Sequence, residues 1–418
     1  MQPVEGLIHA AWIIPVEPHA VVHKNYSLAF NQGRIIALMP TADARQKFSA
    51  THEYELGDHV LIPGLVNTHT HLAMSLLRGY ADDLPVMDWL QQHIWPAEHR
   101  WASAEFVADG TLLGCAEMLR GGVTCFNDMY FFPDITAQVA QTVGLRAVIG
   151  LIVFDFPTVW AANADEYLSK GLDLYDRLKD QPLLRCAFAP HAPYTVSDQP
   201  LERIRTLADE LSIPIHMHVH ESEAEVTESI VRFGLRPLQR LDALGLLSPS
   251  LLAVHMTQLI ESEIELIAKR GVQVIHCPES NLKLASGFCP VTRLMAEGVN
   301  VALGTDGAAS NNDLDMLGEL RTAALLAKGI TKDARALPAA DALRMATLNG
   351  ARALGLDQEI GSLELGKAAD LVALDLNALN TLPLYSPLSQ LVYSARSTQV
   401  SHVWVNGRLL LNDRQFCP

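Results

Sequence analysis

Two histidines one residue apart, His69 and His71, follow an apolar run that begins at Leu61. Side chains at positions i and i+2 of a β-strand lie on the same face, so both imidazoles can bind one metal ion. Pro63 and Gly64 precede them and mark a bend, because proline cannot donate a hydrogen bond to a sheet. A pair of surface histidines would show the same spacing. The rest of the chain therefore has to decide between the two interpretations.

Seven more apolar runs follow, separated by segments with helical spacing, at residues 122–128, 145–154, 184–191, 213–220, 251–255, 272–276 and 299–306. This alternation is typical of repeated βα units around a parallel sheet, and eight strands can close a barrel. The sequence thus predicts an α/β fold with a (β/α)8 TIM-type barrel. The long stretch 75–101 is expected to form a loop and helices over the first strand.

Five of the eight runs end in polar residues that an apolar strand would not otherwise carry. These are His69 with His71, His191, His218 with His220 and Glu221, His255, and Asp306. The carboxyl ends of barrel strands form the active-site face, so these side chains are expected to converge.

Three imidazoles and one carboxylate from this group form a predicted metal site. Its ligands would be His69, His71, His218 and Asp306, a set that suits Zn²⁺ or Fe²⁺ and leaves a position for water. The run 184–191 offers no lysine that could bridge two ions, so a single ion is the simpler interpretation. We expect one divalent ion per subunit, with Zn²⁺ preferred and Fe²⁺ or Mn²⁺ as alternatives.

Such an ion lowers the pKa of bound water toward neutrality and makes it a usable nucleophile. Asp306 could take the proton of this water, and Glu221 could protonate a ring nitrogen of the electrophile. His255 could polarise the attacking water or hold a tetrahedral intermediate. Aspartate before glycine is more often a turn residue, so the catalytic interpretation of Asp306 depends on the other strand-end residues.

The two ends of the chain predict a second domain. Residues 1–60 contain short apolar runs between turn signals, and residues 360–418 contain another set, in which Asn406-Gly407 is a strong hairpin signal. Neither set could bury a face alone. We therefore predict one discontinuous β-sandwich of short antiparallel strands, with the catalytic barrel at 61–359.

Composition narrows the partners and the location. A formal charge of −16 over 418 residues argues against nucleic-acid binding, which needs clustered Lys and Arg, and favours a small substrate. Six scattered cysteines predict reduced, buried thiols. The sequence shows no signal segment and no apolar run long enough to span a membrane, which predicts a cytoplasmic protein without a membrane partner. The composition is compatible with a homo-oligomer.

Taken together, these motifs resemble the amidohydrolase superfamily. The resemblance lies in residues 63–71, 190–194, 218–221, 254–255 and 304–307, and it extends to the closing segment 361–372. Within the superfamily the chain is most similar to the 5-methylthioadenosine/S-adenosylhomocysteine deaminases, a group close to the triazine chlorohydrolases. The motif set is specific for the superfamily and less so for the substrate.

The resemblance implies hydrolytic deamination of the adenine ring of a purine nucleoside, in which ammonia leaves from C6 and an inosine product results. It implies that His69, His71, His218 and Asp306 bind the metal ion. It also implies that Glu221, His255 and Asp306 transfer protons. Glu98 falls where the family places a carboxylate that accepts from ribose hydroxyls. His191 falls where it places a substrate-binding imidazole, and Glu221 would also bind the ring.

The substrate prediction depends on residues 149–160, where some members carry arginines that hold the homocysteine carboxylate. Here this segment has no basic residue, and an apolar wall suits a methylthio group better than a zwitterion. We therefore predict 5′-methylthioadenosine, with S-adenosylhomocysteine and adenosine still open. The alternatives are a triazine-type chlorohydrolase, which needs less proton delivery by Glu221, and a guanine-type purine deaminase. A non-catalytic metal-binding protein on the same fold is the alternative from another class.

Overall fold

The computed structural model describes residues 1–417, which form two compact units. One unit contains Asn67–Cys115 and Phe126–Leu314, and it holds every residue predicted for the site. The other contains Met1–Val66, Ala116–Cys125 and the described residues from Asp315 onward. The boundaries drawn from the sequence, after residues 60 and 359, remain a prediction.

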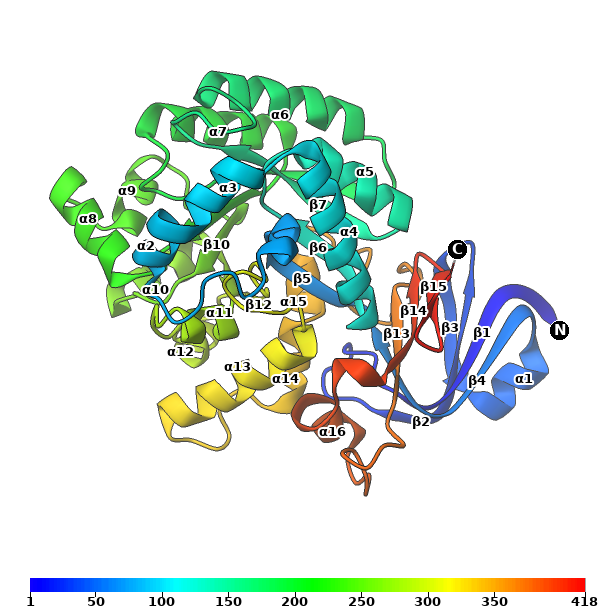
Figure 1. Cartoon of the computed structure of the whole chain (residues 1–418). Coiled ribbons are helices and arrows are strands. Elements are labelled where there is room, and N and C mark those ends of the chain that lie inside the picture. The colour runs from blue at the N-terminus through cyan, green and yellow to red at the C-terminus, as the bar shows by residue number, and fades with distance from the viewer. Residues whose placement is uncertain (418) are drawn as a thin grey trace. The chain divides into compact units, whose positions relative to one another are not determined.

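Eight strands of one parallel sheet follow one another in sequence order, which confirms the predicted barrel of α/β type (Figure 1). Their bounds are β5 (Leu65–Thr70), β6 (Val123–Asp128), β7 (Arg146–Val153), β8 (Leu184–Pro190), β9 (Ile215–Val219), β10 (Leu251–His255), β11 (Gln273–His276) and β12 (Val301–Leu303). Almost every residue in them is buried, as expected for strands covered on both faces.

Hydrogen bonds connect β5, the first strand of this sheet, to the end of β12 and the residues that follow it. Thr68 Oγ1 donates to the Leu303 carbonyl at 2.7 Å. Asn67 exchanges two bonds with Thr305, at 2.8 and 3.0 Å. One residue further on, the Asp306 N–H donates to the His69 carbonyl at 3.0 Å. The barrel therefore closes where two predicted ligands, His69 and Asp306, lie side by side.

Helices connect the strands. Their bounds are α4 (Ala104–Arg120), α5 (Pro133–Val143), α6 (Ala164–Leu178), α7 (Asp198–Leu211), α8 (Glu223–Phe233), α9 (Pro237–Ala243), α10 (Glu261–Arg270), α11 (Pro278–Lys283), α12 (Val291–Ala296), α13 (Met316–Thr331), α14 (Ala339–Met345) and α15 (Leu348–Ala353). Local signals set their ends. Asn163 and Ser222 accept N–H bonds in the first turns of α6 and α8. Gly234 and Gly271 end α8 and α10 in the left-handed conformation, which glycine adopts without strain.

The stretch between β5 and α4 forms a loop and helices, as predicted. It contains η1 (Leu72–Leu77), α2 (Val86–Asp88), η2 (Trp89–Ile94) and α3 (Trp95–Trp101), and the last three follow one another without a break. The η2 turn is π-helical. Pro96, in the first turn of α3, has no N–H to donate, which interrupts a regular helical ladder at this point.

Both termini build a second, eight-stranded sheet, which confirms the predicted β domain. Its order is β16-β15-β14-β13-β4-β1-β2-β3. The bounds are β1 (Gln2–Ile13), β2 (His23–Asn31), β3 (Arg34–Pro40), β4 (Phe48–Pro63), β13 (Leu371–Asp375), β14 (Val400–Val405), β15 (Arg408–Asn412) and β16 (Gln415–Phe416). Ile8, Leu61, Leu371 and Trp404 share one core in this sheet, so neither end of the chain buries its apolar face alone.

One turn and one strand pair of this second sheet bear on the predicted hairpin and the predicted antiparallel pairing. Asn406-Gly407 forms the turn between β14 and β15, with positive φ at both residues, as the hairpin signal predicted. The expectation of antiparallel strands is wrong for one pair, because β1 and β4 are parallel. The reason is α1 (Thr41–Lys47), a helix between β3 and β4, since such a connection lets the chain cross over before β4 begins.

All six cysteines are free, and five of them are buried, in agreement with the prediction of reduced thiols. Across residues 1–417, no helix has both the length and the apolar character that a membrane crossing requires.

The Thr68 bond offers a test of barrel closure. Thr68→Val removes one buried hydroxyl while keeping the branched shape, and it leaves the Leu303 carbonyl without this donor. We expect a loss of about 1–3 kcal/mol in the free energy of unfolding, measured by urea denaturation. Thr142→Val is the matched control, because it deletes an exposed hydroxyl that bonds to a helix carbonyl. Equal midpoints for the two variants would contradict the role given to Thr68.

Candidate active site

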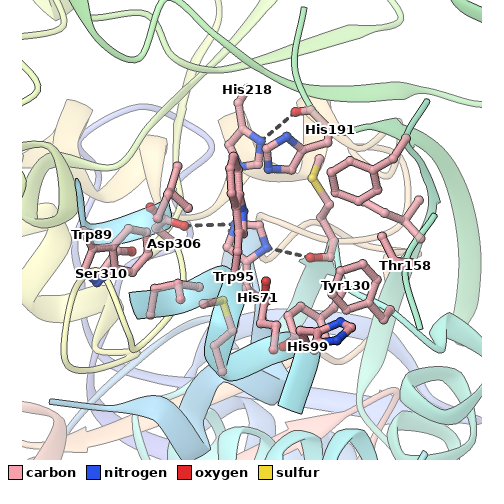
Figure 2. A pocket seen from close by; sticks show the side chains of 18 of the residues that line it. His71, Trp89, Trp95, His99, Tyr130, Thr158, His191, His218, Asp306 and Ser310 are labelled. Atoms are coloured by element: carbon pink, nitrogen blue, oxygen red, sulfur yellow. Dashed lines mark hydrogen bonds and ion pairs between the residues drawn. The ribbon is translucent and has the colours of Figure 1, made fainter. Parts of the chain in front are cut away.

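The residues predicted from the sequence converge on one pocket of about 300 Å³. Seven of the eight line it, namely His71, Glu98, His191, His218, Glu221, His255 and Asp306. The eighth, His69, is fully buried next to the same cluster. Figure 2 shows His71, His218 and Asp306 together, with Tyr130 and Thr158 farther across the pocket. The convergence of strand ends is therefore as predicted.

Four side chains bring their ligand atoms together. One atom each from His69, His71, His218 and Asp306 lie within 4.8 Å of one another. Asp306 Oδ1 is 3.2 Å from His69 Nε2 and 3.3 Å from His71 Nε2. His69 Nε2 is buried, and next to Asp306 Oδ1 it makes no further hydrogen bond in residues 1–417, so it can serve as a ligand atom. The donor set thus fits one divalent ion.

The charge states of His69 and Asp306 suit a cation as well. Burial lowers the pKa of His69 to about 4, so its ring is neutral at pH 7. Burial alone would raise the pKa of Asp306, but His69 and His71 beside it hold that pKa well below its usual range. One more group of potential ligands is present in residues 1–417, His9 with Glu53 and Glu55. There Arg45 already pairs with both carboxylates.

Backbone carbonyls orient two of the histidines. The Nδ1–H of His71 donates to the Met129 carbonyl at 2.6 Å, and that of His218 donates to the His191 carbonyl at 2.7 Å. A carbonyl can only accept, so both rings carry a proton on Nδ1, and in the neutral ring Nε2 then has the lone pair that can bind a metal ion. Both rings are therefore preset as ligands.

Asp306 is held by its neighbours and by two glycines. Ser280 Oγ donates to Asp306 Oδ2 at 2.7 Å, and the Gly307 N–H donates to Oδ1 at 2.8 Å. Asp306 has φ +63°, a left-handed conformation that aspartate adopts more readily than most other residues. A Cβ on Gly304 would lie 2.8 Å from the backbone nitrogen of His69, so only glycine allows this close approach.

His255 and Glu221 face each other across the pocket. His255 Nε2 is 4.0 Å from Glu221 Oε1, and His255 Nδ1 bonds to Asn281 Oδ1 at 2.9 Å. Burial raises the pKa of Glu221, so this carboxyl keeps its proton to a higher pH than an ordinary glutamate. Its backbone N–H donates to Glu225 at 2.7 Å. A carboxyl with a raised pKa in this position could serve as a proton donor.

Three of these supporting residues were not predicted from the sequence. Ser280 and Asn281 lie on α11, and Glu225 lies on α8. The signal that could have found the first two is their place in the short segment after β11, since that strand also ends at the active-site face. Glu225 carries no such signal, because a glutamate in the first turn of a helix is commonplace.

The outer part of the pocket combines one carboxylate with an apolar wall. Glu98, on α3, lies near Tyr130, and burial raises the pKa of Glu98 to about 7. The wall contains Phe154, Phe156 and Val159. No Lys or Arg is present among the described residues that line the pocket. An occupant would therefore have an uncharged part next to this wall.

His191 lies between the wall and the ligand cluster. Its ring stacks on Phe154 with 4.8 Å between centroids, and Thr195 Oγ1 is 3.1 Å from its Nδ1. Burial lowers the pKa of His191 to about 3, so the ring is neutral and can exchange hydrogen bonds with a bound molecule.

Comparison with known proteins places this site in a family, since the profile of the amidohydrolase family matches residues 60–410. The chain belongs to the amidohydrolase family. It is therefore a metal-dependent hydrolase that acts on carbon–nitrogen bonds. A 5-methylthioadenosine/S-adenosylhomocysteine deaminase from Saccharophagus degradans is 49% identical, over 99% of this chain and 93% of that protein.

Solved structures of similar proteins agree with the fold. An adenosine deaminase from Xanthomonas campestris with bound Zn is 56% identical, with a TM-score of 0.99, and the match covers 100% of this chain and 95% of that one. The atrazine chlorohydrolase of Arthrobacter aurescens, complexed with zinc, is 23% identical with a TM-score of 0.91, over 98% and 96% of the two chains. This second likeness concerns the fold alone.

Metal content tests the ligand cluster. The wild-type chain is expected to retain about one equivalent of divalent metal after gel filtration, and His218→Ala to lose most of it, because one of four ligands is removed. Elemental analysis of the purified proteins measures this. His402→Ala, which removes a partly buried histidine from β14, is expected to keep the wild-type content. Full retention of metal by His218→Ala would exclude His218 as a ligand.

Proposed function

We propose that this chain catalyses the metal-dependent hydrolytic deamination of an adenine nucleoside, with 5′-methylthioadenosine as the preferred substrate. One observation carries the proposal. Three members of the ligand cluster, the largely buried carboxyl of Glu221 and a second carboxyl at Glu98 all border one pocket. This arrangement supports a reaction of the purine ring next to the ligand cluster and Glu221. It also supports recognition of the ribose by Glu98, in the outer part of the pocket.

His69, His71, His218 and Asp306 would hold the ion, and their nitrogen and oxygen donors favour Zn²⁺. The zinc in the Xanthomonas campestris structure supports the same choice. A bound divalent ion acts as a Lewis acid that lowers the pKa of water and so provides a nucleophile at neutral pH.

The chain's own side chains would move the protons. Asp306 accepts a proton from water as the water oxygen bonds to C6 of the purine, and Glu221 delivers one to the adjacent ring nitrogen. His255 stabilises the oxygen that has been added. The C6–N bond then breaks as the proton held by Asp306 passes to the amino group, which leaves as ammonia, and the added hydroxyl returns its proton to Glu221. The products are the inosine derivative and ammonia, so water and the nucleoside are fully accounted for.

Glu98 and the apolar wall would select the nucleoside. A carboxylate can accept hydrogen bonds from both ribose hydroxyls, which a triazine does not possess. Phe154, Phe156 and Val159 suit a methylthio group, whereas the ammonium and carboxylate of S-adenosylhomocysteine would lose water without gaining a Lys or Arg partner. Hydrogen bonds between Thr158 and Tyr167 and from Lys170 to the Trp160 carbonyl hold this wall in place.

A substrate panel tests the function. We expect ammonia release from 5′-methylthioadenosine, less from adenosine and S-adenosylhomocysteine, and none from guanine. We also expect no chloride release from atrazine, because the Glu98 carboxylate finds no sugar hydroxyl there. Chloride release from atrazine without ammonia release from any nucleoside would contradict the proposal in favour of a chlorohydrolase. Ammonia release from guanine alone would favour a guanine-type deaminase.

Glu221→Gln separates catalysis from mere metal binding. The amide cannot donate an acidic proton, so kcat is expected to fall by about 10²–10⁴-fold while metal content and melting temperature stay at wild-type values. Glu223→Gln, two residues further on and exposed, is the matched control and is expected to keep full activity. Unchanged turnover in Glu221→Gln would remove this residue from the mechanism.

The wall can be tested by adding a charge. Wild type is expected to show a kcat/KM at least about 10-fold higher for 5′-methylthioadenosine than for S-adenosylhomocysteine. Val159→Arg places a guanidinium at the wall and should narrow this ratio by favouring the homocysteine carboxylate. Val231→Arg, on an exposed part of α8, should leave the ratio unchanged. A wild-type preference for the homocysteine compound would refute the assignment.

A further inference from the structure

The three histidines of the ligand cluster differ in what holds their Nδ1 atoms. His71 and His218 donate to backbone carbonyls, which can only accept. His69 instead has a second imidazole as its partner, because its Nδ1 lies 2.8 Å from Nε2 of His216. Both rings of this pair are fully buried. The proton on His69 is therefore not preset by the backbone.

One proton can occupy the space between these two nitrogen atoms. If it belongs to His69, that ring carries Nδ1–H and has a lone pair on Nε2, and His216 keeps its own proton on Nδ1. If it belongs to His216, the neutral His69 ring carries its proton on Nε2, directed at Asp306 Oδ1 at 3.2 Å. The first arrangement allows His69 to bind a cation, and the second prevents it. Both rings stay neutral throughout, so no proton is gained or lost.

We propose that His216 is a positioning residue that holds His69 in its metal-binding tautomer. The inference rests on the proposed metal site, and it gives a role to a strand histidine that is not itself a ligand. His216 lies two residues before His218 on β9, so both face the barrel interior, and each ring centroid is 4.9 Å from that of His69. His218 contributes a ligand atom to the cluster, whereas His216 reaches the other side of the His69 ring.

The surroundings of His216 leave its choice of tautomer open. Its Nδ1 is buried and makes no hydrogen bond, so no acceptor fixes which of its nitrogen atoms is protonated. Nε2 is thus free to accept from His69 when a cation occupies the opposite side of that ring. Partners in this position generally orient metal-binding histidines, and their loss weakens metal affinity by about 10–100-fold.

A pair of variants of similar size tests the inference. His216→Met keeps much of the side-chain volume but offers no good acceptor, whereas His216→Gln places an amide oxygen within reach of the His69 Nδ1–H. The measurement is the dissociation constant for Zn²⁺, obtained by competition with a chromophoric chelator. We expect His216→Met to bind Zn²⁺ about 10–100-fold more weakly than wild type, and His216→Gln to stay within about threefold of it.

A control variant excludes general loosening of the barrel. His276 is another buried strand-end histidine, on β11, and its Nδ1 makes no hydrogen bond. His276→Met is expected to bind Zn²⁺ as wild type does. Wild-type affinity in His216→Met, or an equal loss in the Met and Gln variants, would overturn the role of His216. If the wild-type chain itself binds no Zn²⁺, the proposed metal site fails together with the inference.

Discussion

Closure of the barrel brings together groups that are far apart in the chain. Asn67 and Thr305 are separated by 238 residues, yet each donates a hydrogen bond to the other inside the sheet. The next contact along this seam is the bond from the Asp306 N–H to the His69 carbonyl. Buried backbone hydrogen bonds therefore fix the position of Asp306 relative to His69, and side-chain motion can change it little.

The groups around this seam are oriented before any substrate arrives. Carbonyls hold His71 and His218, and Ser280 and Asn281 on the short helix α11 hold Asp306 and His255. Burial keeps the imidazole of His69 neutral, as a metal ligand must be, and it raises the pKa of Glu221, as suits a proton donor. Because these side chains are already oriented, they need to reorganise little during the reaction.

Much of the fold and most of the site could be predicted from the sequence, because both depend on periodic patterns. Apolar runs that alternate with helical spacing identify barrel strands, and the histidines at their ends identify the active-site face. Ser280, Asn281 and Glu225 escaped because their importance lies in hydrogen bonds that only the folded chain brings about. The parallel pairing of β1 and β4 escaped because strand patterns fix which face is buried but not the direction of the neighbour.

The role of the cation is tested most directly by removing it and returning it in one sample. Ammonia release from 5′-methylthioadenosine would be measured before chelation, after chelation and during stepwise addition of Zn²⁺, with metal content determined at each step. Activity should disappear with the metal and return in proportion to it, and it should level off near one equivalent per chain. Full turnover in the metal-free chain would contradict the account.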